Sequence, residues 1–147
     1  MNNIEASSDL FNQGYSCAQA ICAAFGPRYG IDRDTCLRLS SALGGGVGRQ
    51  GDTCGAVVGA LIILGLDCGA IVVEDPAAKA QAYARASEFI SRFNELHKTV
   101  TCRELMGVDI STPEGMKRAG ELGLSKTICP VLVKDAASIL QSMIDKG

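Results

Sequence analysis

Apolar residues recur at intervals of three and four positions along much of the chain. Within residues 76–97, one such stripe contains Ala82, Ala86, Phe89, Ile90 and Phe93. This spacing is typical of an amphipathic α-helix with one buried face. The chain is rich in Ala, Leu, Ile and Gly and only 5% aromatic, which suits close-packed helices. We therefore expect an all-α fold of about six or seven helices in a single domain, residues 1–147.

The stretch Gly44–Leu66 predicts the central helix of this fold. Its first part, Gly44–Gly51, contains five glycines and leads to an apolar run that begins at Cys54. A helix that is apolar on every side has to be buried. Asp52 or Thr53 would cap it, which puts Cys54 in its first turn. The run covers 13 residues, fewer than the roughly 20 that span a membrane, so no stable membrane insertion is expected.

Capping motifs mark several other helix starts. Ser16 with Gln19, and Thr101 with Glu104, have the spacing of reciprocal capping boxes, which makes Cys17 and Cys102 the first helical residues. Asp75-Pro76 has the order of an N-cap followed by proline in the first turn, and Cys129-Pro130 has the same order. Residues 67–75 form a connection, in which residues 70–73 resemble a short strand.

Four of the seven cysteines therefore share one local context. Cys17, Cys54, Cys102 and Cys129 each fall at the predicted N-terminus of a different helix. Unpaired N–H groups and about half a positive charge at such a terminus lower the pKa of a thiol from about 8.5 towards neutrality. One such cysteine could be an ordinary small residue at an element boundary, because free cysteine often packs as an apolar side chain. Four of them predict a site assembled from distant segments.

The other candidate residues carry weaker signals. Cys22 and Cys36 fall on apolar helix faces and are expected in the core. The sequence assigns no role to Cys68. His97 is expected to stabilise a helix end by its charge, ahead of ligating metal or moving a proton. Arg49, in the glycine-rich loop, could stabilise a nearby thiolate. That loop lacks Gly-Lys-Ser/Thr, so a close backbone passage is favoured over phosphate binding.

Charge and cysteine content narrow the functional classes. A net charge of −2 without a basic run disfavours nucleic acid and anionic membranes as partners. The N-terminal segment lacks the pattern of a signal peptide, so a cytoplasmic location is expected. In that reducing compartment, seven cysteines favour metal binding or thiol redox chemistry over structural disulfides. The expected partner is a redox protein or a small molecule, and a homo-oligomer is one of the open alternatives.

These residues resemble the C_GCAxxG_C_C family of small redox-active proteins, which is named for four cysteines. The family's Cys-Gly-Ala-x-x-Gly motif corresponds to residues 54–59, with Cys17 before it and Cys102 and Cys129 after it. The resemblance covers nearly the whole chain, including residues 14–18 and the glycine-rich loop. It implies cysteine-based redox activity and no particular substrate. Related domains in split-Soret cytochromes bind haem through CxxCH motifs, which this chain lacks, so haem is not expected.

Three hypotheses follow for Cys17, Cys54, Cys102 and Cys129. In the leading one, some or all of them converge in a thiol/disulfide oxidoreductase without a cofactor, where one thiolate reacts and a neighbour resolves the product. In the second, all four hold a zinc ion or an iron–sulfur cluster. In the third, the protein is non-catalytic and its cysteines have no common site. The reacting pair and the substrate stay open.

Overall fold

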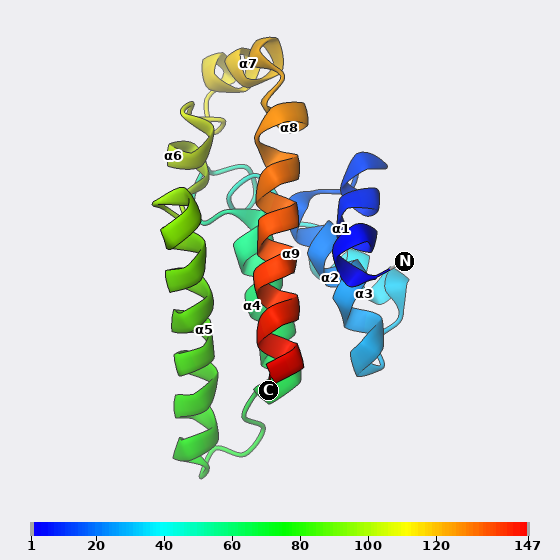
Figure 1. Ribbon diagram of the computed structural model, residues 1–147. Helices are drawn as coiled ribbons and strands as arrows, with labels where there is room; N and C mark the ends of the chain where they lie inside the picture. Colours follow the sequence, from blue (N-terminus) through cyan, green and yellow to red (C-terminus); the bar gives the residue numbers. More distant parts are fainter. Residues whose placement is uncertain (1, 147) are drawn as a thin grey trace.

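In a computed structural model, which describes residues 2–146, the chain is helical and has no strand in this part. The elements in chain order are α1 (Asn3–Asn12), α2 (Cys17–Phe25), the 3-10 helix η1 (Gly26–Tyr29), α3 (Arg33–Leu39), α4 (Gly55–Cys68), α5 (Pro76–His97), α6 (Cys102–Met106), α7 (Pro113–Leu122), α8 (Leu124–Thr127) and α9 (Cys129–Lys146). The all-α prediction is confirmed. Residues 2–146 form nine α-helical segments and not six or seven, partly because α8 and α9 are separate segments of one nearly continuous column (Figure 1). The single-domain prediction also included Met1 and Gly147, which lie outside the described residues, and it stays a prediction.

The apolar helix α4 lies at the centre, as its sequence predicted. Helices α2, α5 and α9 pack against it, and α1 packs against both α2 and α9. Figure 1 shows α5 on one side of the α4–α9 pair and α1–α3 on the other. Val57, Ala60 and Ile63 of α4 are at most 1% exposed. Each large aliphatic side chain buried in this way contributes roughly 1.5–3 kcal/mol relative to an exposed one.

Helix α5 begins as predicted, because the Asp75 side chain accepts a hydrogen bond from the backbone N–H of Ala78 at 3.0 Å. Phe89 and Phe93, on its predicted apolar stripe, are fully buried. At its C-terminal end, Nε2 of His97 lies 2.8 Å from Oδ2 of Asp135 on α9. This contact ties the end of α5 to α9, while a charge effect of His97 on the helix end stays a prediction.

The expected connection between α4 and α5 is present but shorter than residues 67–75, because α4 extends to Cys68 and the connection covers residues 69–75. Residues 70–73, which resembled a strand, have no strand structure. Ile71 is 98% exposed and Val73 is 96% exposed, so neither side chain has a neighbouring strand to pack against. The β-branched side chains of this segment favour an extended conformation, but they do not form a strand without a hydrogen-bonded partner strand.

By length and composition, one helix of the described residues could span a membrane: the column Leu124–Lys146, with a mean hydropathy of 1.3. It is a different segment from the apolar run considered in the sequence, which is α4. Val133, Ala136, Ala137 and Leu140 of this column are fully buried in the core. Packing against α1, α4 and α5 therefore accounts for its apolar face.

Candidate functional site

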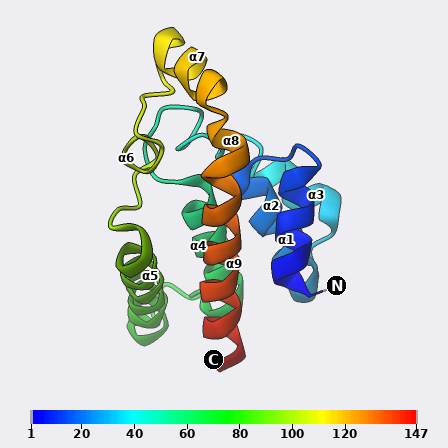
Figure 2. The same cartoon turned by 45° about the horizontal axis from the view of Figure 1, so that its top comes forward.

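The four predicted cysteines are carried by segments at one end of the molecule. Figures 1 and 2 show α4 and α9 running away from this end, where the glycine-rich loop and α6 also lie. Cys17 and Cys102 are the first residues of α2 and α6, as predicted, while Cys129, which was expected to be an N-cap, is the first residue of α9. Cys54 is itself the N-cap of α4, so the expected cap at Asp52 or Thr53 is wrong.

A short backbone pairing explains the position of Cys54. Thr53 forms an antiparallel β-bridge with Thr101. The N–H of Cys54 donates to the carbonyl of Val100 at 2.7 Å, and the N–H of Cys102 donates to the carbonyl of Asp52. The bridge holds residues 52–54 extended, so the helix can begin only after Cys54. It also places the segments that carry Cys54 and Cys102 side by side.

The same pairing replaces the capping box expected at α6. The Thr101 side chain makes no capping hydrogen bond. Glu104 instead accepts from the hydroxyl of Thr99 at 3.2 Å. The N–H of Thr101, which Glu104 would have accepted in a capping box, donates to Oγ1 of Thr99 at 3.1 Å, and the N–H of Cys102 donates to the carbonyl of Asp52. Prediction of Cys102 as the first helical residue was right, but the capping box was wrong.

The capping box at α2 is confirmed. The N–H of Gln19 donates to Oγ of Ser16 at 3.2 Å, and the N–H of Ser16 donates to Oε1 of Gln19 at 3.1 Å. The motif's glycine then lets α4 approach this helix start. A Cβ on Gly55 would lie 3.2 Å from the backbone nitrogen of Ala18 and 3.4 Å from Cβ of Cys17. A Cβ at position 55 would therefore need these neighbours to move by a few tenths of an ångström.

The glycine-rich loop packs against the cysteines, as favoured from the sequence. Residues 45–49 all have a positive φ, between 59° and 71°. This left-handed run includes Val47, for which such a conformation is rare because its side chain is β-branched. A Cβ on Gly46 would lie only 2.7 Å from Cβ of Cys102. The glycine is therefore required by both its φ and its contact with Cys102.

Cys129 occupies a different setting from the one predicted. Helix α8 ends only one residue before α9, and the intervening Ile128 has helical φ and ψ angles of −95° and −54°. Cys129 therefore lies at a junction within the α8–α9 column, not at a free helix start capped by its own side chain. Pro130 has no N–H to donate to the preceding turn, which interrupts the helix at this point. The sequence signal of a helix start came from that proline.

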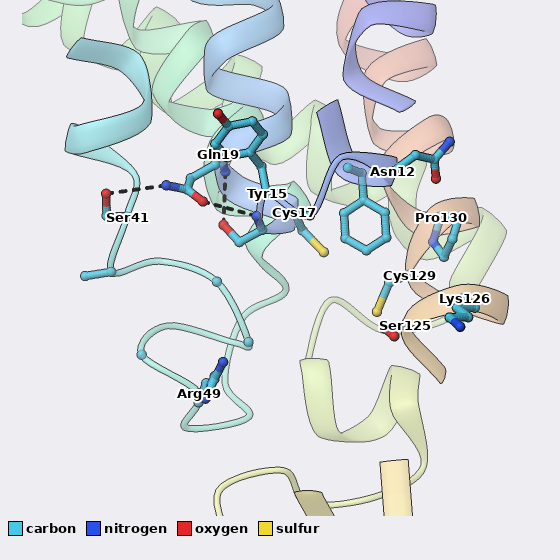
Figure 3. A pocket seen from close by; sticks show the side chains of 17 residues that line it. Asn12, Tyr15, Cys17, Gln19, Ser41, Arg49, Ser125, Lys126, Cys129 and Pro130 are labelled. Carbon is cyan, nitrogen blue, oxygen red and sulfur yellow. Dashed lines mark hydrogen bonds between the residues drawn. The ribbon is translucent and has the colours of Figure 1, made fainter. Parts of the chain in front are cut away.

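Two of the four cysteines line an open pocket of about 950 Å³. Cys17 and Cys129 belong to its wall, together with the end of α1, the glycine-rich loop with Arg49, and Lys126 of α8 (Figure 3). Cys54 and Cys102 do not line it and are only 3% and 8% exposed. We call Cys17 and Cys129 the open pair, and Cys54 and Cys102 the buried pair.

Within the open pair, the two thiols have opposite acidities. The Cys17 thiol, acting as a hydrogen-bond donor to the Cys129 sulfur, lowers the pKa of Cys129. That same hydrogen bond, followed by burial, raises the pKa of Cys17 well above its ordinary value. When one of the two loses its proton, it is therefore Cys129, and Cys17 keeps its own.

In the buried pair, both thiols resist ionisation. Burial raises the pKa of Cys54, although its thiolate would accept hydrogen bonds from the N–H groups of Ala56 and Val57 at the start of α4. Burial, with the nearby thiolates of Cys54 and Cys129, raises the pKa of Cys102 to about 11. The predicted acidification at a helix start is therefore wrong for Cys54, Cys102 and Cys17. For Cys129 the pKa is lowered, as predicted, but the largest cause is the hydrogen bond from Cys17.

The four cysteines are near enough to influence one another, since a charge on Cys54, Cys129 or Cys102 would raise the pKa of Cys17. Among residues 2–146, however, no three His, Cys, Asp or Glu side chains are grouped so that they could hold one metal ion. All seven cysteines are free thiols. The arrangement is thus a pair of thiols at a pocket with a second pair behind it.

The remaining cysteines and two further residues complete the description. Cys22 and Cys36 are buried in the core as predicted, and Cys68 closes α4, where its thiol donates to the carbonyl of Leu64 at 3.2 Å. Sequence reasoning missed Lys126 and Met106. Sδ of Met106 lies 3.6 Å from Sγ of Cys129.

Both missed residues had a signal in the sequence. Met106 follows Cys102 by four positions, one helical turn along α6. Lys126 precedes Cys129 by three positions, but this becomes a helical neighbour only when the column is known to begin at Leu124. Pro130 gave the signal of a helix start at residues 129–130, so the earlier start of the column at Leu124 was not predicted.

Comparison with known proteins agrees with the cysteine pattern. The family model described as "Putative redox-active protein (C_GCAxxG_C_C)" matches residues 15–143. Neither the curated proteins nor the solved structures contain a match. The matched range starts two residues before Cys17 and ends beyond Cys129, so it contains both pairs. The chain therefore belongs to the C_GCAxxG_C_C family.

Proposed function

We propose that the protein is a thiol/disulfide oxidoreductase in which Cys129 is the attacking thiolate and Cys17 the resolving thiol. The observation that carries the proposal is that both cysteines line the same pocket, where the Cys17 thiol lowers the pKa of Cys129. The attacking group in disulfide exchange is a thiolate that its substrate can reach. Cys129 meets both conditions, since its pKa is lowered and it lines the pocket.

The reaction then has two exchange steps. The Cys129 thiolate attacks one sulfur of a substrate disulfide, forming a mixed disulfide and releasing the other half as a thiolate. Cys17 loses its proton to that released thiolate and attacks the Cys129 sulfur, releasing the second half. The products are two thiol equivalents and a Cys17–Cys129 disulfide, so two electrons pass from the protein to the substrate. A dithiol reductant restores the protein by the reverse exchange.

The buried pair has no part in this first reaction. Cys54 and Cys102 are closed off from the pocket, and their raised pKa values keep them as thiols at neutral pH. Their charges would also oppose a thiolate on Cys17. Keeping them neutral therefore helps Cys17 to ionise when it has to resolve the mixed disulfide.

The test is to find which disulfide forms first. The reduced protein is treated with one equivalent of 2,2′-dithiodipyridine, its thiols are blocked in acid, and its peptides are mapped by mass spectrometry. We expect two pyridine-2-thione molecules released per protein and a Cys17–Cys129 bridge, with Cys36→Ala as a matched control that gives the same bridge. A Cys54–Cys102 bridge, or a mixed disulfide that is never resolved, would overturn the assignment.

Metal content separates this proposal from the alternative of a zinc or iron–sulfur protein. Charges on Cys54, Cys102 and Cys129 would each raise the pKa of Cys17, so the four thiols lie near one another. This proximity is the observation that favours the alternative. Protein purified without oxygen is analysed for zinc and iron. One stoichiometric metal or cluster that is lost in Cys17→Ser and Cys54→Ser would replace the redox proposal by a binding function.

A further inference from the structure

The pocket beside the open pair has a charge opposite to that of the whole chain. The chain carries a net charge of −2. The charged residues that line the pocket are both cations, Arg49 from the glycine-rich loop and Lys126 from α8. Among the described residues, no Asp or Glu belongs to the lining. A positive pocket of this kind concentrates anions next to the sulfurs.

The two cations approach from different sides. In Figure 3, the sulfurs of Cys17 and Cys129 are seen between Arg49 on the loop and Lys126 on α8. Lys126 is on the same helical column as Cys129, three residues earlier, so the two share one face of that column. Arg49 comes from a segment about 80 positions earlier in the chain.

The conformation of the glycine-rich loop sets the position of the Arg49 backbone. Arg49 has a φ of 61° and is the last residue of the left-handed run. A Cβ on Gly45 would lie 2.8 Å from Cγ of Arg49, so the glycine makes room for the arginine side chain as it crosses the loop. Arg49 is exposed and belongs to the lining of the pocket. Its guanidinium suits a carboxylate, to which it can donate two parallel hydrogen bonds.

We propose that the substrate of the open pair is a small disulfide with anionic groups on both halves, such as a dicarboxylate. This rests on the proposed function and adds the substrate class. A volume of about 950 Å³ falls within the range of small-molecule pockets, whereas a folded protein would need an extended surface. One anionic half meets Arg49 and the other meets Lys126, which leaves the disulfide over Cys129.

The cations also support the two exchange steps. Each step releases a thiolate from a substrate that already carries negative charge. Without cations, the Cys129 thiolate would repel such a substrate. Arg49 and Lys126 reverse that repulsion and hold the released half near the site. They therefore act by binding and orienting the substrate, while the bonds are made and broken at sulfur.

Two aromatic disulfides of opposite character test the substrate class. 5,5′-Dithiobis(2-nitrobenzoate) carries a carboxylate on each half, and 2,2′-dithiodipyridine is neutral at pH 7. We expect the double variant Arg49→Gln, Lys126→Gln to lose at least tenfold more of the native rate with the anionic probe than with the neutral one. High salt should reduce the native rate only for the anionic probe.

Matched charge changes serve as controls. Arg118→Gln and Lys117→Gln, on the exposed surface of α7 outside the pocket, remove the same two charges and should leave both rates within twofold. Arg49→Lys should keep part of the preference for the anionic probe. Equal losses for both probes, or equal losses in the α7 double variant, would overturn the proposal.

The outcome for Cys129→Ser keeps the two proposals apart. If this variant still reacts rapidly with the neutral probe, the assignment of Cys129 as attacking thiol is wrong. If it is inactive while the Arg49 and Lys126 variants match the native protein with both probes, the redox proposal stands and only the anionic substrate is wrong. Helical circular dichroism of every variant checks that a slow rate does not come from unfolding.

Discussion

The open pair and the buried pair start from the same local design, but only the open pair lines a pocket and only it contains a thiol with a lowered pKa, Cys129. Each of the four cysteines stands at or next to the first residue of a helix. Yet Cys129 is acidified and faces a pocket, while Cys54 and Cys102 resist ionisation behind it. The comparison shows that a helix start by itself does not make a thiol reactive.

Magnitudes explain which effect decides. A charge at a helix N-terminus gains typically 0.3–1 kcal/mol, and about 2 kcal/mol in favourable sites. Full burial can move a pKa by about 3–5 pH units, and one pH unit corresponds to about 1.36 kcal/mol. For Cys54, burial therefore outweighs the two N–H groups that would bond its thiolate. Cys129 escapes this outcome because a second thiol donates to it.

The sharpest way to break the comparison is to remove one sulfur from each pair. Cys129→Ser should lower the rate with 2,2′-dithiodipyridine at pH 7 by at least 100-fold, because serine supplies no thiolate. Cys54→Ser should leave the initial rate within threefold. Stopped-flow absorbance of the released thione measures both. If Cys54→Ser were as slow as Cys129→Ser, the two pairs would not have separate roles.

A second experiment isolates the hydrogen bond within the open pair. A thiol reacts as its thiolate, so a lowered pKa keeps Cys129 reactive as the pH falls below the range of an ordinary thiol. Cys17→Ala removes the donor and should move the midpoint of the alkylation rate to higher pH. The reaction at pH 6 then slows roughly tenfold when that midpoint rises by one pH unit. Iodoacetamide kinetics between pH 5 and 9 provide the measurement, with Cys22→Ala as the core control. An unchanged midpoint would contradict the role of Cys17.

The glycine-rich loop allows a test of how closely the buried pair is packed. At Gly46, with a φ of 71°, a Cβ would lie 2.6 Å from the backbone nitrogen of Asp52 and 2.7 Å from Cβ of Cys102. At Gly48, with a φ of 59°, the nearest atom would be 3.8 Å away. Gly46→Ala should lower the free energy of unfolding by about 2–4 kcal/mol, combining backbone strain with overpacking, and Gly48→Ala by about 1–2 kcal/mol from strain alone. Urea unfolding measures both free energies, and equal losses would show that the close packing around Gly46, against the backbone of residues 51–52 and Cys102, does not contribute to stability.

The smallest expected effect concerns Met106, the neighbour of Cys129 outside the pair. Its thioether lies 3.6 Å from the Cys129 sulfur and can accept a weak hydrogen bond only while that thiol is protonated. Met106→Leu keeps the volume and removes the acceptor, so the alkylation rate of Cys129 at pH 6 should rise by less than threefold. Leu105→Met, a similar exchange on the same helix, is the control. A slower reaction in Met106→Leu would mean that the methionine stabilises the thiolate instead.

Much of this protein follows from its sequence. The stripe through Phe89 and Phe93 predicted α5, and the apolar run after Cys54 predicted the central α4. Ser16 and Gln19 predicted the start of α2 down to its hydrogen bonds. These features are local, since a helix face or a cap depends on residues a few positions apart. The family's four cysteines could be picked out for the same reason.

The chemistry of those cysteines was decided by tertiary structure. The bridge between Thr53 and Thr101 moved the start of α4 to Cys54 and removed the capping box expected at α6. Packing buried Cys54 and Cys102 and left Cys17 beside Cys129 at a pocket. A thiol's acidity depends on its exposure to water and on the charges and donors within a few ångströms. Those neighbours come from segments far apart in the chain, so no local pattern could rank the four helix starts.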